Sequence, residues 1–258
     1  MRRIAASLIG VALMLVGIPA LPLKAETATV AVAANFFAPL EQLQTMFEEE
    51  TGHELVLTSG STGQLYAQIV NGAPFDVFLS ADSEHPTRLV AEGLGDPSTQ
   101  HTYAIGKLAL WTHDPEKFDP LDLTTLKRTD FRWLAVANPE LAPYGIAAEQ
   151  TLKALSLWEP LQPRLVRGQS IAQTFAMAEI GNAELALVAL SQALVYQGVA
   201  RYFEVPAELY EPLRQDAVLL NRAGDNGAAR AFVAWLRGPR AGEIIAGFGY
   251  GTAPVASR

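Results

Sequence analysis

The sequence contains no cysteine and only four histidines among its 258 residues. The lack of cysteine excludes disulfides, lipid attachment through a cysteine and thiolate metal sites. The four histidines are scattered and lack the spacing of metal ligands, so we interpret them as surface or loop residues: His53, His85, His101 and His113. The sequence therefore predicts no site for a metal cation.

Basic residues are also scarce: the sequence has 19 Lys and Arg and 27 Asp and Glu, which gives a formal net charge of −8. No basic stripe is present, which argues against nucleic acid as a partner. This charge does not help to steer an anion toward the protein either. Any anion site must act through local dipoles and hydrogen bonds, since distant charges are screened beyond about 8 Å in physiological salt.

One long apolar run is present, over residues 4–21, and Arg2 and Arg3 precede it. It is short for a membrane-spanning helix, and Gly17 and Pro19 interrupt its end, which disfavours the alternative of a membrane anchor. We expect residues 1–25 to be a signal peptide that is cleaved after Ala25, which places the mature chain in a bacterial periplasm.

Strand-like and helical segments alternate along the rest of the chain, which predicts an α/β fold with doubly wound parallel sheets. The expected strands are Thr29–Ala34, His53–Thr58, Phe75–Ser80, Tyr103–Trp111, Trp133–Ala137, Arg164–Arg167, Glu184–Leu190, Ala200–Val205 and Asp216–Leu220. The expected helices are about Phe36–Glu50, Thr62–Asn71, Glu84–Glu92, Ile146–Leu155, Ser170–Glu179, Gln192–Gln197 and Gly227–Leu236.

Small or polar residues occupy four of the junctions between a strand and the next helix. Short junctions place the helix N-termini at the carboxyl edge of the sheet, where ligands of open α/β folds bind. The first N–H groups of a helix have no partner within the helix and carry the positive end of its dipole, which suits an anion. The four junctions are Asn35, Ser61-Thr62-Gly63, Tyr144-Gly145 and Ser170-Ile171.

Each junction, taken alone, also fits an ordinary N-cap. Ser61 with Gln64, and Ser170 with Gln173, have the Ser-x-x-Gln spacing of a capping box. The recurrence of four uncharged, donor-bearing caps in the two halves of the chain favours a cleft that closes on one small anion.

No motif supplies a catalytic site, so we expect no enzyme activity. Gly106-Lys107 lacks the earlier glycine and the following Ser or Thr of a phosphate loop. Gly60–Gly63 is not a Gly-x-Ser-x-Gly nucleophile elbow, which leaves a secreted hydrolase as a weaker alternative.

Over essentially its whole mature length the sequence resembles the periplasmic molybdate-binding proteins of ABC transporters, a family that binds molybdate and tungstate. The run Gly-Ala-Pro-x-Asp-x-Phe-x-Ser-Ala-Asp, from Gly72 to Asp82, is the most specific part. The residues that carry the resemblance are Val32–Phe36, Thr51–His53, Ser59–Gly63, Ala67–Pro74, Asp76–Phe78, Ser80–Asp82, Asn138-Pro139, Ala142–Gly145 and Gly238-Pro239.

The resemblance implies a two-lobed periplasmic binding protein of type II, with a doubly wound sheet in each lobe and two crossing strands between the lobes. We expect the crossings at Tyr103–Trp111 and near Asp216–Leu220. Residues 26–106 and 217–258 then form lobe 1, and residues 107–216 form lobe 2.

The resemblance further implies that hydroxyls and backbone N–H groups hold the oxyanion without counter-charges or a cofactor. The matching positions are Asn35, Ser61, Thr62, Tyr144 and Ile171, with the adjacent Ala34 as a further candidate. One position departs from the family, because Ala189 stands where many members have a tyrosine whose hydroxyl contacts the ligand.

The implied partners are a small inorganic oxyanion and a membrane ABC permease, and we expect the protein to be a monomer. Sulfate or another tetrahedral oxyanion remains the main alternative ligand. A regulatory effector-sensing module could share the two-lobed fold, but the expected signal peptide stands where such a module would carry a DNA-binding domain.

Overall fold

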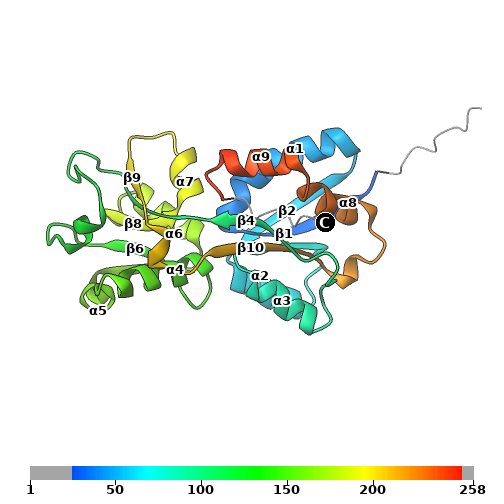
Figure 1. Ribbon diagram of the computed structural model, residues 1–258, viewed down its shortest axis with the longest axis horizontal. Coiled ribbons are helices and arrows are strands. Elements are labelled where there is room, and N and C mark those ends of the chain that lie inside the picture. Colours follow the sequence, from blue (N-terminus) through cyan, green and yellow to red (C-terminus); the bar gives the residue numbers. More distant parts are fainter. Residues whose placement is uncertain (1–24, 252–258) are drawn as a thin grey trace, which may run out of the picture.

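The computed structural model describes residues 25–251, which form two α/β lobes side by side (Figure 1). Residues 1–24, most of the expected signal peptide, lie outside the described residues. The strands are β1 (Thr27–Ala33), β2 (Glu54–Gly60), β3 (Val77–Leu79), β4 (His101–Gly106), β5 (Leu108–Thr112), β6 (Leu134–Ala137), β7 (Leu165–Gly168), β8 (Leu185–Ala189), β9 (Arg201–Glu204) and β10 (Leu213–Leu219). The α-helices are α1 (Phe37–Thr51), α2 (Thr62–Val70), α3 (Glu84–Ala91), α4 (Pro143–Ala154), α5 (Trp158–Leu161), α6 (Ile171–Glu179), α7 (Leu190–Val195), α8 (Gly227–Leu236) and α9 (Pro239–Gly247).

Each lobe contains one mixed five-stranded sheet, and the two sheets share a pattern. The order is β2-β1-β3-β10-β4 in lobe 1 and β7-β6-β8-β5-β9 in lobe 2. In lobe 1, β1 runs parallel to β2 and β3, and β10 is antiparallel to both β3 and β4. In lobe 2, β6 is parallel to β7 and β8, and β5 is antiparallel to β8 and β9. The fold is therefore the expected two-lobed α/β arrangement, with antiparallel strands added to each parallel set.

Helices cover both faces of each sheet, because both faces are apolar. In lobe 1, α1, α8 and α9 enclose one core cluster, and α2 and α3 enclose another on the opposite face (Figure 1). In lobe 2, α4 covers one face and α6 and α7 cover the other. Parallel strands buried on both faces read as continuous apolar runs, as in Leu185–Ala189.

The first crossing between the lobes lies inside the segment that we predicted as one strand, Tyr103–Trp111. It consists of two strands, since β4 ends at Gly106 in the first sheet and β5 begins at Leu108 in the second. A Cβ atom at Gly106 would overlap the Tyr144 hydroxyl and the Gln215 amide. Glycine is therefore required where the chain leaves lobe 1.

The return crossing lies earlier than the predicted region near Asp216–Leu220. That region belongs to β10, which begins at Leu213 and pairs with β3 and β4. The connecting segment is residues 205–212, after β9. The predicted crossing lies too late in the chain because residues 217–219 form the most apolar part of β10, whereas the first half of this strand carries Arg214, Gln215 and Asp216.

Helices α4 and α7 start earlier than predicted, and the short helix α5 and helix α9 lie outside the predicted helices. Helix α4 starts at Pro143, three residues before the predicted Ile146, because proline is well tolerated in a first helical turn. Helix α9 was not predicted. It packs on α1 and α8 and buries Ala241 and Ile245.

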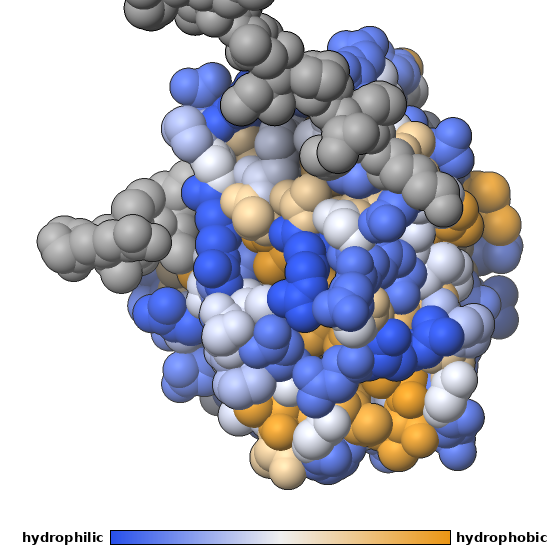
Figure 2. Space-filling view, turned by 90° about the vertical axis from the view of Figure 1, so that its right-hand side faces the viewer, coloured by the Kyte–Doolittle hydropathy of each residue, from blue (hydrophilic) through white to orange (hydrophobic). Residues whose placement is uncertain are grey.

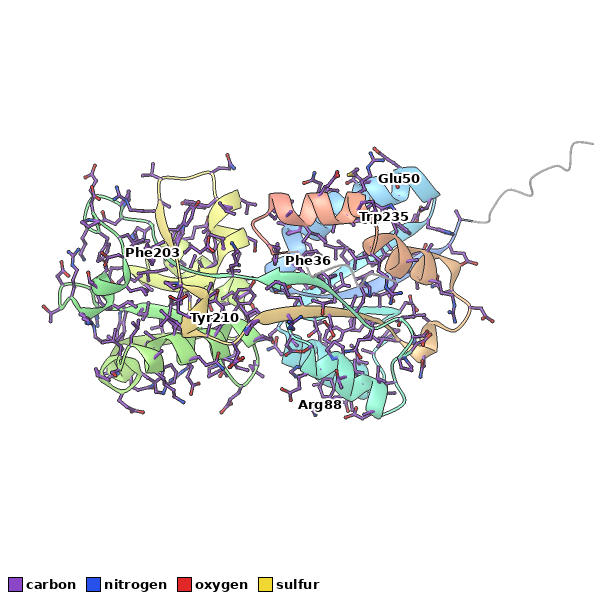
Figure 3. All side chains as sticks on the ribbon, viewed as in Figure 1. Phe36, Glu50, Arg88, Phe203, Tyr210 and Trp235 are labelled. Atoms are coloured by element: carbon purple, nitrogen blue, oxygen red, sulfur yellow. The ribbon has the colours of Figure 1, made fainter. Side chains whose placement is uncertain are left out.

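The side chains labelled in Figure 3 illustrate how the interior and the surface differ. Phe36 lies fully buried in the core of lobe 1, and Tyr210 is buried in lobe 2. At the outer end of lobe 1, Trp235 is partly exposed and its indole donates a 2.7 Å hydrogen bond to Glu50.

The end face of lobe 1 shows hydrophilic side chains with apolar ones between them (Figure 2). In the described part of the chain, the most exposed large apolar side chains are Val199 and Ile180, both in lobe 2. Exposed apolar residues of this kind are ordinary on protein surfaces. Within residues 25–251, no helix has the length and apolarity needed to cross a membrane.

Candidate functional site

The predicted site residues occupy the junctions at the carboxyl ends of parallel strands. Strand β1 leads into the short 3-10 helix η1 (Ala34–Phe36), and β2 leads through Ser61 into α2. In lobe 2, β6 precedes α4, and β7 leads through Ser170 into α6. The five principal residues are at most 3% exposed: Asn35, Ser61, Thr62, Tyr144 and Ile171.

Ser61 stands at the N-cap of α2, but its side chain makes no capping hydrogen bond. The predicted capping box at Ser61 and Gln64 is therefore wrong. The Ser61 Oγ is buried and has no hydrogen-bond partner within the described residues. A buried hydroxyl without a partner is costly, which makes this group available to a ligand.

Thr62 has a different role from Ser61, because its hydroxyl is partly engaged. Its Oγ1 accepts a 3.0 Å hydrogen bond from the backbone N–H of Ala81, which links the start of α2 to the segment after β3. The hydroxyl proton of Thr62 is not used in this bond. Thr62 therefore combines a structural contact with a free donor.

We predicted that Asn35 caps the first helix, and this prediction is wrong. Asn35 lies inside η1, whose N-cap is Ala33. Its side-chain amide donates to Gln215 Oε1 at 2.9 Å and to the Tyr250 hydroxyl at 3.0 Å. Both amide hydrogens are thereby used, and the Oδ1 atom has no partner within the described residues. The donor that Asn35 can offer an anion is its backbone N–H.

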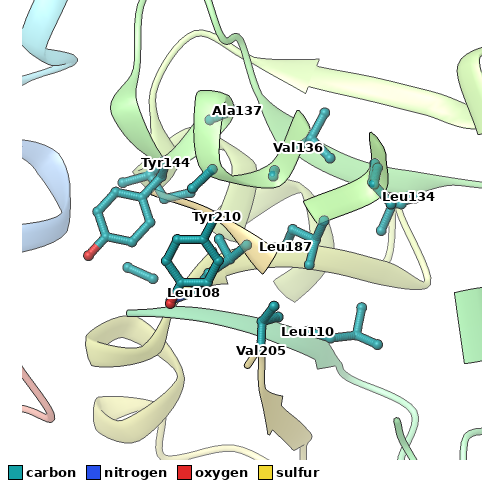
Figure 4. Close-up of a cluster of buried hydrophobic side chains, with 14 of the residues drawn as sticks. Leu108, Leu110, Leu134, Val136, Ala137, Tyr144, Leu187, Val205 and Tyr210 are labelled. Carbon is teal, nitrogen blue, oxygen red and sulfur yellow. The ribbon is translucent and has the colours of Figure 1, made fainter. Parts of the chain in front are cut away.

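Tyr144 lies in the first turn of α4 and belongs to the core cluster of lobe 2. Its hydroxyl points away from the apolar side chains of that cluster (Figure 4) and accepts a 3.2 Å hydrogen bond from Gln215 of lobe 1.

Within residues 25–251, the backbone N–H groups of Thr62, Tyr144 and Ile171 donate to no other group. These N–H groups are the unpaired donors that helix N-termini present to an anion.

Ser170 caps α6 as predicted, but the reciprocal bond of a capping box to the N–H of Ser170 itself is not made. Its Oγ accepts from the N–H of Gln173 at 3.2 Å, and Gln173 Oε1 accepts from the N–H of Gln169 at 2.6 Å. This fixes the first turn of α6 and leaves the adjacent Ile171 N–H without an internal acceptor.

A fifth junction, from β8 into α7, was not among the four predicted helix-start junctions, although Ala189 at this junction was noted as a departure from the family. Ala189 itself offers no side-chain donor, as expected. Gln192 accepts from the Ala189 N–H at 3.2 Å and donates to the Ile171 carbonyl at 3.3 Å, which ties α7 to α6. The Ala-x-x-Gln spacing of Ala189 and Gln192, the same interval as in the two serine boxes, was the signal that could have found it.

The two lobes contact each other directly at the start of α2. The Gly63 N–H of lobe 1 donates a 3.0 Å hydrogen bond to the Leu141 carbonyl of lobe 2. A Cβ atom at Gly63 would lie 3.1 Å from that carbonyl oxygen. This backbone contact shows that the lobes are closed on each other in the structure.

A cavity of about 200 Å³ lies between the lobes. Ala34, Asn35 and Ser59 line it from lobe 1, and Ala172, Ser191 and Gln192 line it from lobe 2. The other predicted residues do not line this cavity. Tyr144 and Ile171 connect to its lining residues through hydrogen bonds, since Gln215 joins Asn35 to Tyr144 and Gln192 contacts Ile171. The side chains of Ser61 and Thr62 make no such connection.

All the candidate residues are uncharged, so the local electrostatics come from helix N-termini and hydroxyls. Burial raises the pKa of the phenols of Tyr103, Tyr144 and Tyr250. These phenols therefore remain protonated and neutral at physiological pH. In the described part of the chain, no group of three or more His, Asp and Glu side chains could hold a metal cation.

Comparison with known proteins places this geometry in a family. Residues 28–251 match the family described as bacterial extracellular solute-binding protein. The chain is 46% identical to the molybdate-binding protein ModA of Azotobacter vinelandii over 91% of this chain and 94% of the relative. It is 44% identical to ModA of Rhodobacter capsulatus over 90% of this chain and 91% of the relative. The solved structure of the periplasmic molybdate-binding protein of Azotobacter vinelandii is 40% identical in sequence and superimposes on this chain with a TM-score of 0.82. The superposition covers 88% of this chain and 99% of the chain in that structure.

Proposed function

The chain belongs to the family of bacterial extracellular solute-binding proteins, and on this premise we propose that it captures molybdate or tungstate between its lobes and delivers the anion to an ABC permease. The similarity to two molybdate-binding relatives supports this ligand class. Within this proposal the mature protein is a periplasmic monomer that binds its ligand without a cofactor and catalyses no reaction.

The observation that supports the proposal is that uncharged donors without an internal partner stand at helix starts in both lobes. Ser61 and Thr62 contribute hydroxyls and helix N-terminal N–H groups from lobe 1, and Tyr144 and Ile171 contribute backbone N–H groups from lobe 2. Asn35 and Ala34 contribute from η1. Hydrogen bonds to a charged partner contribute about 1.5–3 kcal/mol each, so a handful of them can hold a dianion after its desolvation.

The division into lobes follows the two sheets. We assign residues 26–106 and 213–251 to lobe 1 and residues 107–212 to lobe 2. Closure is then a hinge motion at Gly106-Lys107 and at residues 205–212, and ligand contacts made by both lobes favour the closed form.

We expect molybdate and tungstate to raise the thermal stability of the protein much more than sulfate or phosphate. At a concentration 100-fold above the dissociation constant, a ligand stabilises the folded state by about 2.7 kcal/mol. Sulfate is smaller than molybdate and fits the closed site less well. Protonated phosphate needs an acceptor, and none of the candidate residues is a carboxylate.

Thermal shift with the four anions at equal ionic strength measures this preference. A larger thermal shift with sulfate than with molybdate or tungstate would favour the alternative ligand, sulfate. A protein that responds to none of the four anions would refute the oxyanion function.

A further inference from the structure

A group of buried polar side chains joins the lobes beside the proposed oxyanion site. Asn35, Gln215 and Tyr250 belong to lobe 1, whereas Tyr144 and Ser191 belong to lobe 2. Each of the five is at most 5% exposed. Their hydrogen bonds therefore form out of contact with water, where an unpaired group is costly.

Tyr250 lies at the centre of this group. Its hydroxyl donates to the Asn35 carbonyl at 2.7 Å, accepts from the Asn35 amide at 3.0 Å and lies 3.0 Å from the Ser191 hydroxyl. Ser191 Oγ is also 3.2 Å from the Asn35 carbonyl. One phenol thus contacts both the backbone and the side chain of Asn35, together with a hydroxyl of the opposite lobe.

The position of the Tyr250 ring is itself well defined. The ring packs edge-on against Phe36, with centroids 5.4 Å apart, in the same short helix as Asn35. The next residue, Gly251, exchanges backbone hydrogen bonds of 2.8 and 2.9 Å with Ile105 of β4. The C-terminal end of lobe 1 is therefore anchored to the strand that leads into lobe 2.

We propose that Tyr250 is a positioning residue of the oxyanion site, which orients Asn35 and, through Ser191, favours the closed arrangement of the lobes. This inference rests on the proposed function. Tyr250 does not touch the anion in this account. It acts by fixing η1, whose first backbone N–H groups border the cavity between the lobes.

The contact between Tyr250 and Ser191 has a specific energetic signature. Opening of the hinge separates the lobes and breaks this contact, whereas the contacts of Tyr250 with Asn35 remain within lobe 1. The Tyr250–Ser191 pair therefore contributes to the free energy of ligand-induced closure and does not contribute to the stability of the open, unliganded protein.

The test is a double-mutant cycle with Tyr250→Phe, Ser191→Ala and the double variant, measured by calorimetric titration with molybdate and by thermal unfolding without ligand. Each single variant should weaken molybdate binding about fivefold, the effect of one net hydrogen bond. The double variant should weaken binding by clearly less than the product of the two single effects, whereas the effects on unliganded unfolding should be independent.

Tyr66→Phe is the matched control, because the Tyr66 hydroxyl bonds to Glu92 and Arg88 within lobe 1. This variant should bind molybdate like the wild type.

If Tyr250→Phe or Ser191→Ala leaves molybdate affinity unchanged, or if their effects on binding multiply independently, the positioning role is wrong even though the wild type binds. If Tyr250→Phe does not fold, Ser191→Ala alone decides, since unchanged affinity in that variant removes the bridge between lobes. Wild-type protein that binds neither molybdate nor tungstate refutes the proposed function instead.

Discussion

Ser61→Ala should weaken molybdate binding about ten- to hundredfold and leave the unfolding temperature of the unliganded protein unchanged or slightly raised. The Ser61 hydroxyl makes no capping bond and has no partner within the described residues, so its loss removes nothing from the empty protein. In the complex, the loss of one hydrogen bond to a charged ligand costs about 1.5–3 kcal/mol. Calorimetric titration and thermal unfolding of the same variant measure both quantities.

Asn226→Ala provides the opposite control. Asn226 caps α8 through a 3.1 Å bond from the Ala229 N–H, on the outer side of lobe 1. Its replacement should lower stability by about 0.5–2 kcal/mol and leave molybdate affinity unchanged. If Ser61→Ala behaves like Asn226→Ala, Ser61 is a structural residue and not a ligand contact.

Thr62→Ala should differ from both variants, because Thr62 also accepts from the Ala81 N–H. Its loss leaves that buried N–H unpaired, so stability and affinity should fall together. Thr62 is therefore a less selective probe of the site than Ser61.

Gly63→Leu should weaken molybdate binding about ten- to hundredfold while it raises the stability of the unliganded protein. The Cβ atom alone would lie 3.1 Å from the Leu141 carbonyl oxygen of the other lobe, and the rest of the leucine must occupy the same interface. Such overpacking costs about 1–3 kcal/mol in the closed form. In the open form the clash is absent, and leucine is a better helix former than glycine by about 1 kcal/mol.

Gly242→Leu is the matched control, because a Cβ atom at Gly242 in α9 would meet no other atom within 4 Å. This variant should gain helix stability without any change in affinity. The measurements are titration calorimetry and thermal unfolding of both variants. Unchanged molybdate affinity in Gly63→Leu would show that the lobes do not need the Gly63–Leu141 contact to hold the ligand.

Local pattern was sufficient to predict most of the helices and strands. The alternation of apolar strands and amphipathic helices predicted α/β lobes, and the small residues after Ala33, Gly60 and Gly168 predicted helix starts. These inferences succeed because strand and helix periodicity and helix-start chemistry depend on residues close together in the chain. The ends of helix α4 and strand β10 were misplaced, since their boundaries depend on packing as well as on sequence pattern.

The identity of the capping groups could not be predicted in the same way. Ser61 and Ser170 have identical Ser-x-x-Gln spacing, yet Ser170 caps its helix and Ser61 does not. Asn35 looks like a cap in the sequence, but its amide is taken by two partners, one of them 215 positions away.

The sequence alone thus determined the fold class and the uncharged character of the four candidate junctions, because these follow from local composition and periodicity. The tertiary structure decided which hydroxyls remain free, which residues hold Asn35, and that Gly63 and Ser191 meet the opposite lobe. Those facts depend on hydrogen bonds and close contacts between segments far apart in the chain, and a polar group is free or engaged according to what the completed fold places beside it.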